Sequence, residues 1–321
     1  MARTPSFEKT TALVSRALKL SPEALRAGFR PANLDDLAQI LALRAGVLGG
    51  DLRWNDQDYL SWRYHFGSLQ RGRGECWVVK IGAQLLAMVG TEEILVRHQG
   101  NAVPGLSVMD IAVRPELEGI GLGVWMAMQL CHQSECVVAI GSNANSRAIV
   151  SRVLSRVPDR RSYAHLIEFD SMFKRRSKHP WLAAAAAAMA HGAMSIWRCA
   201  AFATRSRAIL VRQLQRFEAD SVEPLIAASQ TTLEISLGRS AAFLNWRLFD
   251  NPRTRYSVWG AWLDARLVGY VAVRPRAADD GTKSLVIEDL LVRADDRRGA
   301  ALLVLLCEAL GLACAQGCER V

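Results

Sequence analysis

The sequence predicts an α/β protein built on a mixed β-sheet, with the same architecture present twice along the 321-residue chain. Three observations predict this fold class. Short apolar runs with the spacing of strands alternate with helically spaced segments between residues 28 and 170. A strand, a glycine-rich loop and a helix follow one another from Leu106 to Gln133. Three short motifs of the first half return in the same order in the second half.

The chain begins with an N-terminal helical extension over residues 1–27, in which Phe7 to Leu20 is weakly amphipathic. Residues 28–32 then predict a short strand, and Asn33 is a suitable N-cap for the helix that follows. Two aspartates fall in the first turn of that helix, where carboxylates interact favourably with the helix dipole. A second helical segment is expected around residues 58–64.

The rest of the first half predicts one sheet with a hairpin turn at Gly82 and a helix after the glycine-rich loop. The sheet closes with a strand that returns after a last helix. The expected strands are 77–81, 84–96, 106–113, 136–140 and 163–169, and the last helix is 146–154.

The glycine-rich loop carries Gly119, Gly121 and Gly123 between a strand and a helix. This arrangement directs free backbone N–H groups and the positive end of a helix dipole toward a bound anion. Glycine also lets a phosphate approach the backbone closely, because it has no Cβ. A P-loop is excluded because Val124 and Trp125 stand where Lys and Ser or Thr are required. A dinucleotide fingerprint does not fit either, because it requires a glycine at position 124. A glycine-rich connection without a ligand is the remaining alternative.

The pattern Val113-x-Pro115-x-x-x-Gly119-x-Gly121-x-Gly123 resembles the pyrophosphate loop of GNAT-superfamily acyltransferases. The opening "RPANLDDLAQI" at residues 30–40 is similar to the first strand and helix of a GNAT domain. The resemblance implies a GNAT-like acyl-CoA N-acyltransferase fold over residues 28–170. It also implies that acetyl-CoA or another acyl-CoA is the co-substrate, and that no metal is needed.

Three motifs repeat between the halves, at offsets that fall from 184 to 182 to 179 residues. They are Tyr59–Arg63 with Phe243–Arg247, Ala83–Val89 with Ala265–Val271, and Met109–Arg114 with Glu288–Arg293. The chain therefore resembles a tandem GNAT protein. The block from Ser240 to Pro252 is similar to proteins found with bacterial exopolysaccharide genes.

The second copy, residues 217–321, departs from the pattern. Its loop has the single glycine Gly299, and Ala300 and Leu302 would obstruct a pyrophosphate. The sequence also ends at Val321, where a fifth strand is expected. We therefore expect a degenerate, C-terminally incomplete second domain and place acyl-CoA in the first.

The resemblance implies which residues bind the cofactor. Backbone amides of the loop would surround the pyrophosphate, and strand backbone would pair with the pantetheine arm. Glu118 stands where the family usually has Arg or Gln. The implied cofactor-binding residues are Ile111, Val113, Glu118, Gly119, Ile120, Gly121, Leu122, Gly123, Val124 and Asn145.

Acyl transfer also needs a base for the nucleophile and a proton for the leaving thiolate. Asp110 matches the family's strand carboxylate, but the glutamate often used beside it is Met109 here. Glu92 and Glu93 on the preceding strand are the substitutes. For each of the three, a solvated or salt-bridged strand residue is the alternative. The tyrosine expected seven residues after Asn145 is Arg152, so no general acid is identified.

The net charge of +9 is confined to one segment. Residues 174–216 hold nine basic residues and no acidic one, and the rest of the chain is balanced at 31 of each sign. This argues against a nucleic-acid-binding protein. Residues 171–216 are expected to form a basic, Ala-rich helical linker, with an apolar run from Trp181 to Trp197. Alanine is too weakly apolar for a membrane span of about 20 residues. The alternatives are a connector packed between domains or a helix lying on an anionic membrane surface.

Seven cysteines without a CxxC pair predict reduced thiols, and no signal peptide precedes the first domain. These features indicate a cytoplasmic protein, with peripheral membrane contact as an alternative. The predicted function is an N- or O-acyltransferase that moves an acetyl or other acyl group from acyl-CoA to an amine or hydroxyl. The main alternative is a non-catalytic tandem scaffold or binding module in polysaccharide or envelope biosynthesis. A third is aminoacyl transfer from tRNA.

Overall fold

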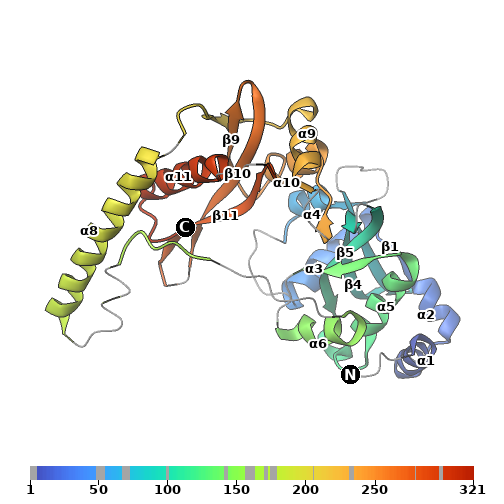
Figure 1. Cartoon of the computed structure of the whole chain (residues 1–321). Coiled ribbons are helices and arrows are strands. Elements are labelled where there is room, and N and C mark those ends of the chain that lie inside the picture. The colour runs from blue at the N-terminus through green and yellow to red at the C-terminus, as the bar shows by residue number, and fades with distance from the viewer. Residues whose placement is uncertain are drawn as a thin grey trace. The chain divides into compact units, whose positions relative to one another are not determined.

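A computed structural model shows the chain as two compact units (Figure 1). Unit 1 is Met1–Asp159 with Glu234–Gly238, and unit 2 is Arg160–Leu233 with Arg239–Val321. The structure describes residues 6–47, 55–66, 73–98, 101–140, 144–155, 163–169, 173, 179–204, 206–230, 235–278, 280–295 and 299–321.

Unit 1 contains a seven-stranded mixed sheet with the order β1-β3-β4-β5-β6, to which β2 and β8 add through β3 and β4. The β2–β3 and β5–β6 pairs are parallel and the others are antiparallel. Strand β8 comes from the second half of the sequence and pairs Leu237 with Val96. The strands are β1 (Phe29–Pro31), β2 (Tyr64–His65), β3 (Gly74–Ile81), β4 (Gln84–His98), β5 (Asn101–Val113), β6 (Val137–Ala139) and β8 (Ile235–Leu237).

Helices cover both faces of this sheet and create two apolar clusters. On one face α3 and α4 pack around Ile40, Leu60 and Met88. On the other face α1, α2 and α5 pack around Val14 and Trp125, so the N-terminal extension is part of the core of unit 1. The helices are α1 (Phe7–Leu18), α2 (Pro22–Gly28), α3 (Leu37–Val47), α4 (Gln57–Arg63), α5 (Leu122–Gln133) and α6 (Ala144–Val153), with short 3-10 turns η1 (Leu34–Asp36) and η3 (Pro115–Leu117).

Local signals explain most of these elements. Gly82 takes a positive φ of 58° in the β3–β4 hairpin, as the turn requires. Asn33 and Asp36 form a capping box before α3, as expected of an N-cap followed by acidic residues. The prediction of a mixed-sheet α/β protein is therefore confirmed.

Unit 2 repeats the central elements of unit 1 in the same chain order. Its sheet has the order β11-β10-β9-β7, and α9, α10 and α11 occupy the sequence positions of α3, α4 and α5. A long helix, α8, precedes the sheet. The elements are α8 (Pro180–Thr204), β7 (Leu210–Leu214), α9 (Ala219–Gln230), α10 (Ala241–Leu248), β9 (Ser257–Leu263), β10 (Arg266–Ala277), β11 (Lys283–Val292) and α11 (Ala300–Ala315).

Two expectations about residues 163–216 are wrong. Residues 163–169 do not close the first sheet. They pair instead with the end of the chain: His165 and Val321 exchange backbone hydrogen bonds, and Leu166 forms an antiparallel β-bridge with Arg320. Arg320 in turn forms a parallel β-bridge with Ser284 at the start of β11. The basic segment is not helical throughout, because residues 210–214 form β7, paired with β9. Both pairings join residues far apart in sequence, which local patterns do not reveal.

Candidate active site

The first feature of the site is an open strand edge on β5. Parallel pairing with β6 covers only Leu106, Ser107 and Val108. Beyond Val108 the strand continues to Val113, and β4 is its partner along that stretch in the described part of the chain. An extended ligand can therefore pair with the other edge of β5 as an added strand.

A β-bulge lies at the start of this open stretch. Gly90 pairs with Met109 and Met88 pairs with Ala112, so β5 holds one residue more than β4 between these pairs. Asp110, in the bulge, has a φ of 52°, which is uncommon for a residue other than glycine. Bulges bend a strand and redirect its side chains, and they are frequent beside active sites.

The glycine loop leads from the end of β5 into α5. Gly119 and Gly121 have φ values of 84° and 91°, and Gly121 is the N-cap of the helix. The first backbone bond of α5 runs from Trp125 N to Gly121 O. The amides of the three residues before Trp125 therefore have no acceptor within the helix, and Gly121 has no side chain to cap them.

The loop residues differ in exposure. Glu118 and Gly119 are exposed, Ile120 and Gly121 are half-buried, and Leu122, Gly123 and Val124 are buried. Gly119 and Gly121 have no side chain and are exposed and half-buried, so their backbone is accessible to a ligand. Gly123 packs closely against α6, and an added Cβ would lie 2.8 Å from Ile149 Cδ1, so that side chain would have to shift. The side chain of Asn145 lies outside the described residues.

The bulge places Asp110 in a polar cluster between the sheet and α3 and α4. Tyr64 Oη donates a hydrogen bond of 2.7 Å to Asp110 Oδ2, and Arg44 Nη1 lies 2.8 Å from the same oxygen. Arg63 donates from Nε to the sulfur of Met109 at 3.0 Å and from Nη1 to the hydroxyl of Tyr59. Tyr64 is fully buried and Arg44 nearly so.

The electrostatics of the cluster keep Asp110 ionised. Burial raises the pKa of Asp110, but the positive charges of Arg44 and Arg63 and the hydrogen bond from Tyr64 outweigh burial and lower it. Burial and the Asp110 charge raise the pKa of Tyr64, so its hydroxyl stays a donor. An ionised carboxylate with a lowered pKa accepts a proton weakly.

The two glutamates of β4 lie in different surroundings. Glu92 is two residues from Gly90 and faces the same side of the sheet. Burial lowers the pKa of Arg63, but its interactions with Tyr64, Tyr59, Asp110 and, least of these, Glu92 outweigh burial and raise it. Glu93 is exposed, pairs with Leu106, and lines a surface depression with Gln133 at the far end of α5 from the glycine loop. The structure thus brings Asp110 and Glu92 to one cluster and leaves Glu93 outside it.

Sequence reasoning did not identify Arg44, Tyr59, Tyr64 or Arg63 as parts of this cluster. A signal for Arg44 existed, because it continues the stripe that Leu37 and Ile40 begin on α3 and so occupies a core position. Arg63 had the signal of its repetition as Arg247. The tyrosines could equally have been ordinary core residues.

Unit 2 contains a cluster of the same composition around Asp289. Tyr270 Oη donates to Asp289 Oδ2 at 2.8 Å, and Arg239 Nη2 lies 2.9 Å from Oδ1. Glu288 stands at the position of Met109 and pairs with Arg247 at 3.3 Å. The tyrosine and the first arginine come from different elements in the two units, so the members that the two clusters share are the aspartate and the arginine of α4 and α10, Arg63 and Arg247.

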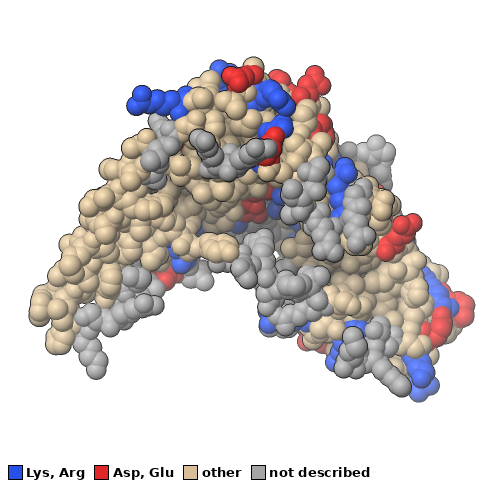
Figure 2. Space-filling view, viewed as in Figure 1, with Lys and Arg blue, Asp and Glu red and all other residues tan. Residues whose placement is uncertain are grey.

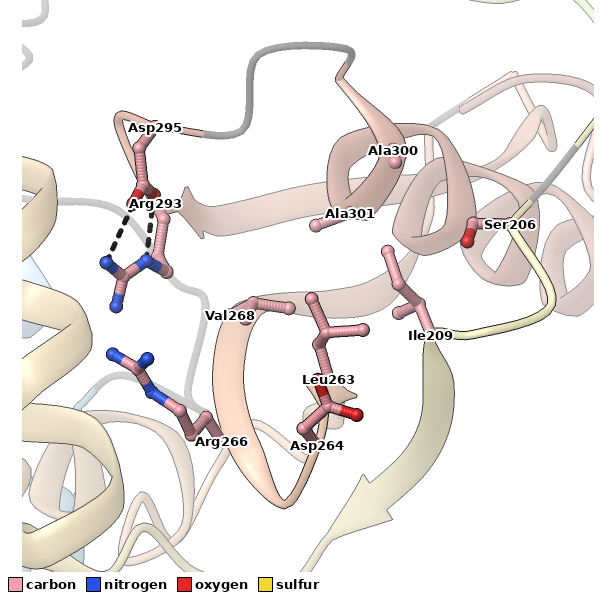
Figure 3. Close-up of a pocket in the computed structure, with 10 residues that line it drawn as sticks. All are labelled: Ser206, Ile209, Leu263, Asp264, Arg266, Val268, Arg293, Asp295, Ala300 and Ala301. Atoms are coloured by element: carbon pink, nitrogen blue, oxygen red, sulfur yellow. Dashed lines mark hydrogen bonds and ion pairs between the residues drawn. The ribbon is translucent and has the colours of Figure 1, made fainter.

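Unit 2 contains a cavity of about 470 Å³, which is not equivalent to the region of the open edge in unit 1 (Figure 3). The β9–β10 turn, the end of β11 and the first turn of α11 surround it, and Arg293 pairs with Asp295 at its rim. By the repeat, its wall residues Val268 and Ala301 correspond to Leu86 and Leu122, which pack against α1 and α2 in unit 1. The cavity of unit 2 therefore corresponds to a region that α1 and α2 cover in unit 1.

Within the described ranges, no group of three or more His, Cys, Asp or Glu residues could hold a metal ion.

No protein-family model matches the chain, and no curated protein matches its sequence. Solved structures do match its fold. A probable N-acyltransferase from Enterococcus faecalis has a TM-score of 0.51 at 13% identity, over 91% of this chain and 63% of that one. Saccharomyces cerevisiae N-myristoyltransferase with bound myristoyl-CoA has a TM-score of 0.52 at 11% identity, over 91% and 75%. A GCN5-related N-acetyltransferase from Anabaena variabilis has a TM-score of 0.52 at 12% identity, over 91% and 64%.

The chain spans about two thirds of the length of these matched chains. The TM-scores establish the fold, and sequence identities this low leave the activity open. The mixed sheet with its bulged β5, open edge and following glycine loop agrees with that fold. The chain therefore has the fold of the GNAT N-acyltransferases.

Proposed function

We propose that the protein is an acyl-CoA-dependent N- or O-acyltransferase and that unit 1 holds its active site. One observation carries the proposal: the open edge of β5 leads through the turn η3 and the glycine loop to the uncapped start of α5. An acyl-CoA carries an extended pantetheine arm joined to a pyrophosphate. The edge suits the arm and the helix start suits the pyrophosphate.

The backbone of β5 supports a specific orientation of the thioester. Arg114 N donates to Leu86 O of β4 at 3.0 Å. Because adjacent residues of a strand direct their N–H groups to opposite edges, the N–H of Val113 points to the open edge. We assign that amide to the thioester carbonyl, Ile111 to the pantetheine arm, and the amides of residues 119–124 to the pyrophosphate. Donors held in place for a developing oxyanion are effective transition-state stabilisers.

The chemistry follows from the thioester. An amine or hydroxyl attacks the carbonyl carbon, the carbon–sulfur bond breaks, the nucleophile loses a proton to a base, and the thiolate of CoA takes up a proton. We propose that Asp110 is a positioning residue that orients Arg44 and Tyr64, because its pKa is lowered. Glu92 then becomes the preferred candidate base. Glu93 is the weakest of the three candidates, because it lies at the far end of α5.

Met109 favours one alternative function. Arg63 faces a thioether at the position where unit 2 has Glu288. A non-catalytic acyl-CoA-binding or scaffold module does not need a carboxylate at position 109, so Met109 favours that function. A role in polysaccharide or envelope biosynthesis belongs to this alternative.

Calorimetric titration with acetyl-CoA and myristoyl-CoA tests the site through a matched pair of variants. Gly119 and Gly281 have φ values of 84° and 82°, and an added Cβ at either position meets nothing within 4 Å. Gly119→Glu places a carboxylate in the loop, and Gly281→Glu causes the same backbone strain in unit 2. We expect at least tenfold weaker binding for Gly119→Glu and unchanged binding for Gly281→Glu.

Equal binding by both variants would place the ligand elsewhere and contradict the proposed site. Release of free CoA thiol in the presence of an amine panel then separates the two functions. Binding without release favours the scaffold, and release favours the transferase.

A further inference from the structure

Helix α8 of unit 2 presents an apolar face to solvent. Between Pro180 and Trp197 the helix contains no Lys, Arg, Asp or Glu. Trp181, Met189 and Ile196 are 69%, 71% and 74% exposed. Their spacing of seven to eight residues, with Ala185 and Gly192 between them, places them on one stripe. In Figure 2 the tan part of α8 is a rod on which no Lys, Arg, Asp or Glu is visible.

The opposite face of α8 is anchored in unit 2, so the outward face is defined. Ala183 and Ala187 are buried. His191 Nε2 accepts a hydrogen bond of 3.3 Å from Phe169 N, and the rings of Trp197 and His165 lie 5.2 Å apart. Turning the exposed stripe inward would break these contacts.

The sequence that contains and flanks α8 carries charge of one sign. Residues 174–216 contain nine Lys and Arg residues and no Asp or Glu, and in sequence they stand on both sides of the apolar run. Trp181, which is 69% exposed, lies on the outward stripe at the N-terminal end of that run. Tryptophan prefers the boundary between lipid and water, and an apolar stripe with basic neighbours is typical of helices that lie in an anionic membrane surface.

We propose that the outward face of α8 docks onto an anionic lipid surface, with the helix axis parallel to the membrane. No helix in the described part of the chain is long and apolar enough to cross a bilayer. A lipid surface fits better than a second copy of this chain. A two-fold pairing of α8 would bring identical basic flanks together, and like charges repel.

Vesicle co-sedimentation tests the proposal with the full chain. The probes are phosphatidylcholine vesicles with and without phosphatidylglycerol. The variant is Met189→Glu with Ile196→Glu, and the matched control is Leu13→Glu, because Leu13 is a 62% exposed apolar residue on α1 of unit 1. We expect wild type and Leu13→Glu to bind the anionic vesicles equally well. Both should bind neutral vesicles at least tenfold more weakly, and the double variant should bind anionic vesicles at least tenfold more weakly than wild type.

Failure of wild type to bind anionic vesicles, or equal binding by the double variant, would overturn the proposal. Sedimentation velocity without lipid provides the second measurement. A wild-type dimer that becomes a monomer in the double variant would assign the face to a second copy and also overturn it. A monomer in both cases, with circular dichroism unchanged, is the expected result.

Discussion

Tyr64 donates its buried hydroxyl to Asp110 at 2.7 Å, across the bulge that separates β5 from regular pairing with β4. The tyrosine is on β2, directly after α4, so this bond ties the bulge to the helical layer. Asp110 holds an uncommon positive φ of 52°, and its contacts with Tyr64 and Arg44 help to maintain that conformation. The bond therefore fixes the backbone that leads to the open edge.

Removing the Tyr64 hydroxyl tests that relationship. Tyr64→Phe removes a buried hydroxyl that donates to the ionised, half-buried Asp110, so we expect the free energy of unfolding to fall by about 2 kcal/mol. Urea unfolding followed by circular dichroism measures it. Tyr163→Phe is the control, because Tyr163 is 85% exposed, and it should leave the stability unchanged. A loss no larger than the control's would show that the bond is not stabilising.

Gly90 tests the close packing of Tyr64 against β4. An added Cβ at Gly90 would overlap the Tyr64 hydroxyl, so Gly90→Ala must displace the tyrosine from Asp110. We expect a loss of about 2 kcal/mol or more, as for other overpacked cores. Gly46→Ala in α3 meets nothing within 4 Å and should be neutral or stabilising, because alanine favours helix. Thermal unfolding of both variants compares them, and a stable Gly90→Ala protein would mean that Tyr64 can move without cost.

Asp36 predicts a specific pH dependence of stability. Its side chain is fully buried and pairs with Arg30 at 2.8 Å and Lys80 at 2.7 Å. Burial raises its pKa, but hydrogen bonds from Arg30 and Lys80 outweigh burial and lower it from 3.8 to about 2. The resulting stabilisation, about 2 kcal/mol, is fully present above pH 3.8 and is lost as the pH falls through about 2.

Asp36→Asn should therefore be less stable than wild type at pH 7, with a difference that shrinks below pH 3.8. Urea unfolding at a series of pH values measures this difference. Asp295→Asn is the control: its pKa is also lowered by Arg293, but it is exposed, so water and salt screen the pair. A difference for Asp36→Asn that does not change with pH would contradict the ionic origin of the effect.

Met109→Glu tests whether unit 1 lacks only one carboxylate. The substitution would give Arg63 the partner that Glu288 provides to Arg247 in unit 2. We expect unchanged acyl-CoA affinity and faster CoA release with an amine acceptor, because the bulge would then hold a second carboxylate. The reciprocal change Glu288→Met should not alter CoA release. Slower release by Met109→Glu would mean that Met109 itself suits the acceptor.

Most elements of residues 28–133 could be predicted because their signals are local. Alternating apolar residues, the Gly82 turn and the Asn33 cap each act over a few residues. Residues 163–169 show the limit, since their partner strand segment is more than 150 residues away at Glu319–Val321. Strand β7 was not predicted, because residues 210–214 show no alternation of apolar and polar residues, and Arg198, Arg205 and Arg212 recur at a seven-residue spacing that is typical of a helix.

The candidate site could be predicted in part. The loop was recognisable because glycine spacing reflects backbone conformation, and Gly119 and Gly121 do adopt positive φ. The cluster around Asp110 was not recognised, because the position of Arg44 on the apolar stripe of α3 shows that it is buried but does not show which residue it faces, and nothing in the sequence distinguishes Tyr64 from an ordinary core tyrosine. Only the packing of α3 and α4 against β4 and β5 brings them together.

Hydrogen–deuterium exchange with and without acetyl-CoA tests the central claim most directly, because it reports on both copies in one sample. We predict slower exchange on ligand addition in peptides covering residues 110–124, and no change in the equivalent residues 289–303. Protection confined to residues 289–303, or none in either segment at saturating ligand, would contradict an acyl-CoA site at the start of α5.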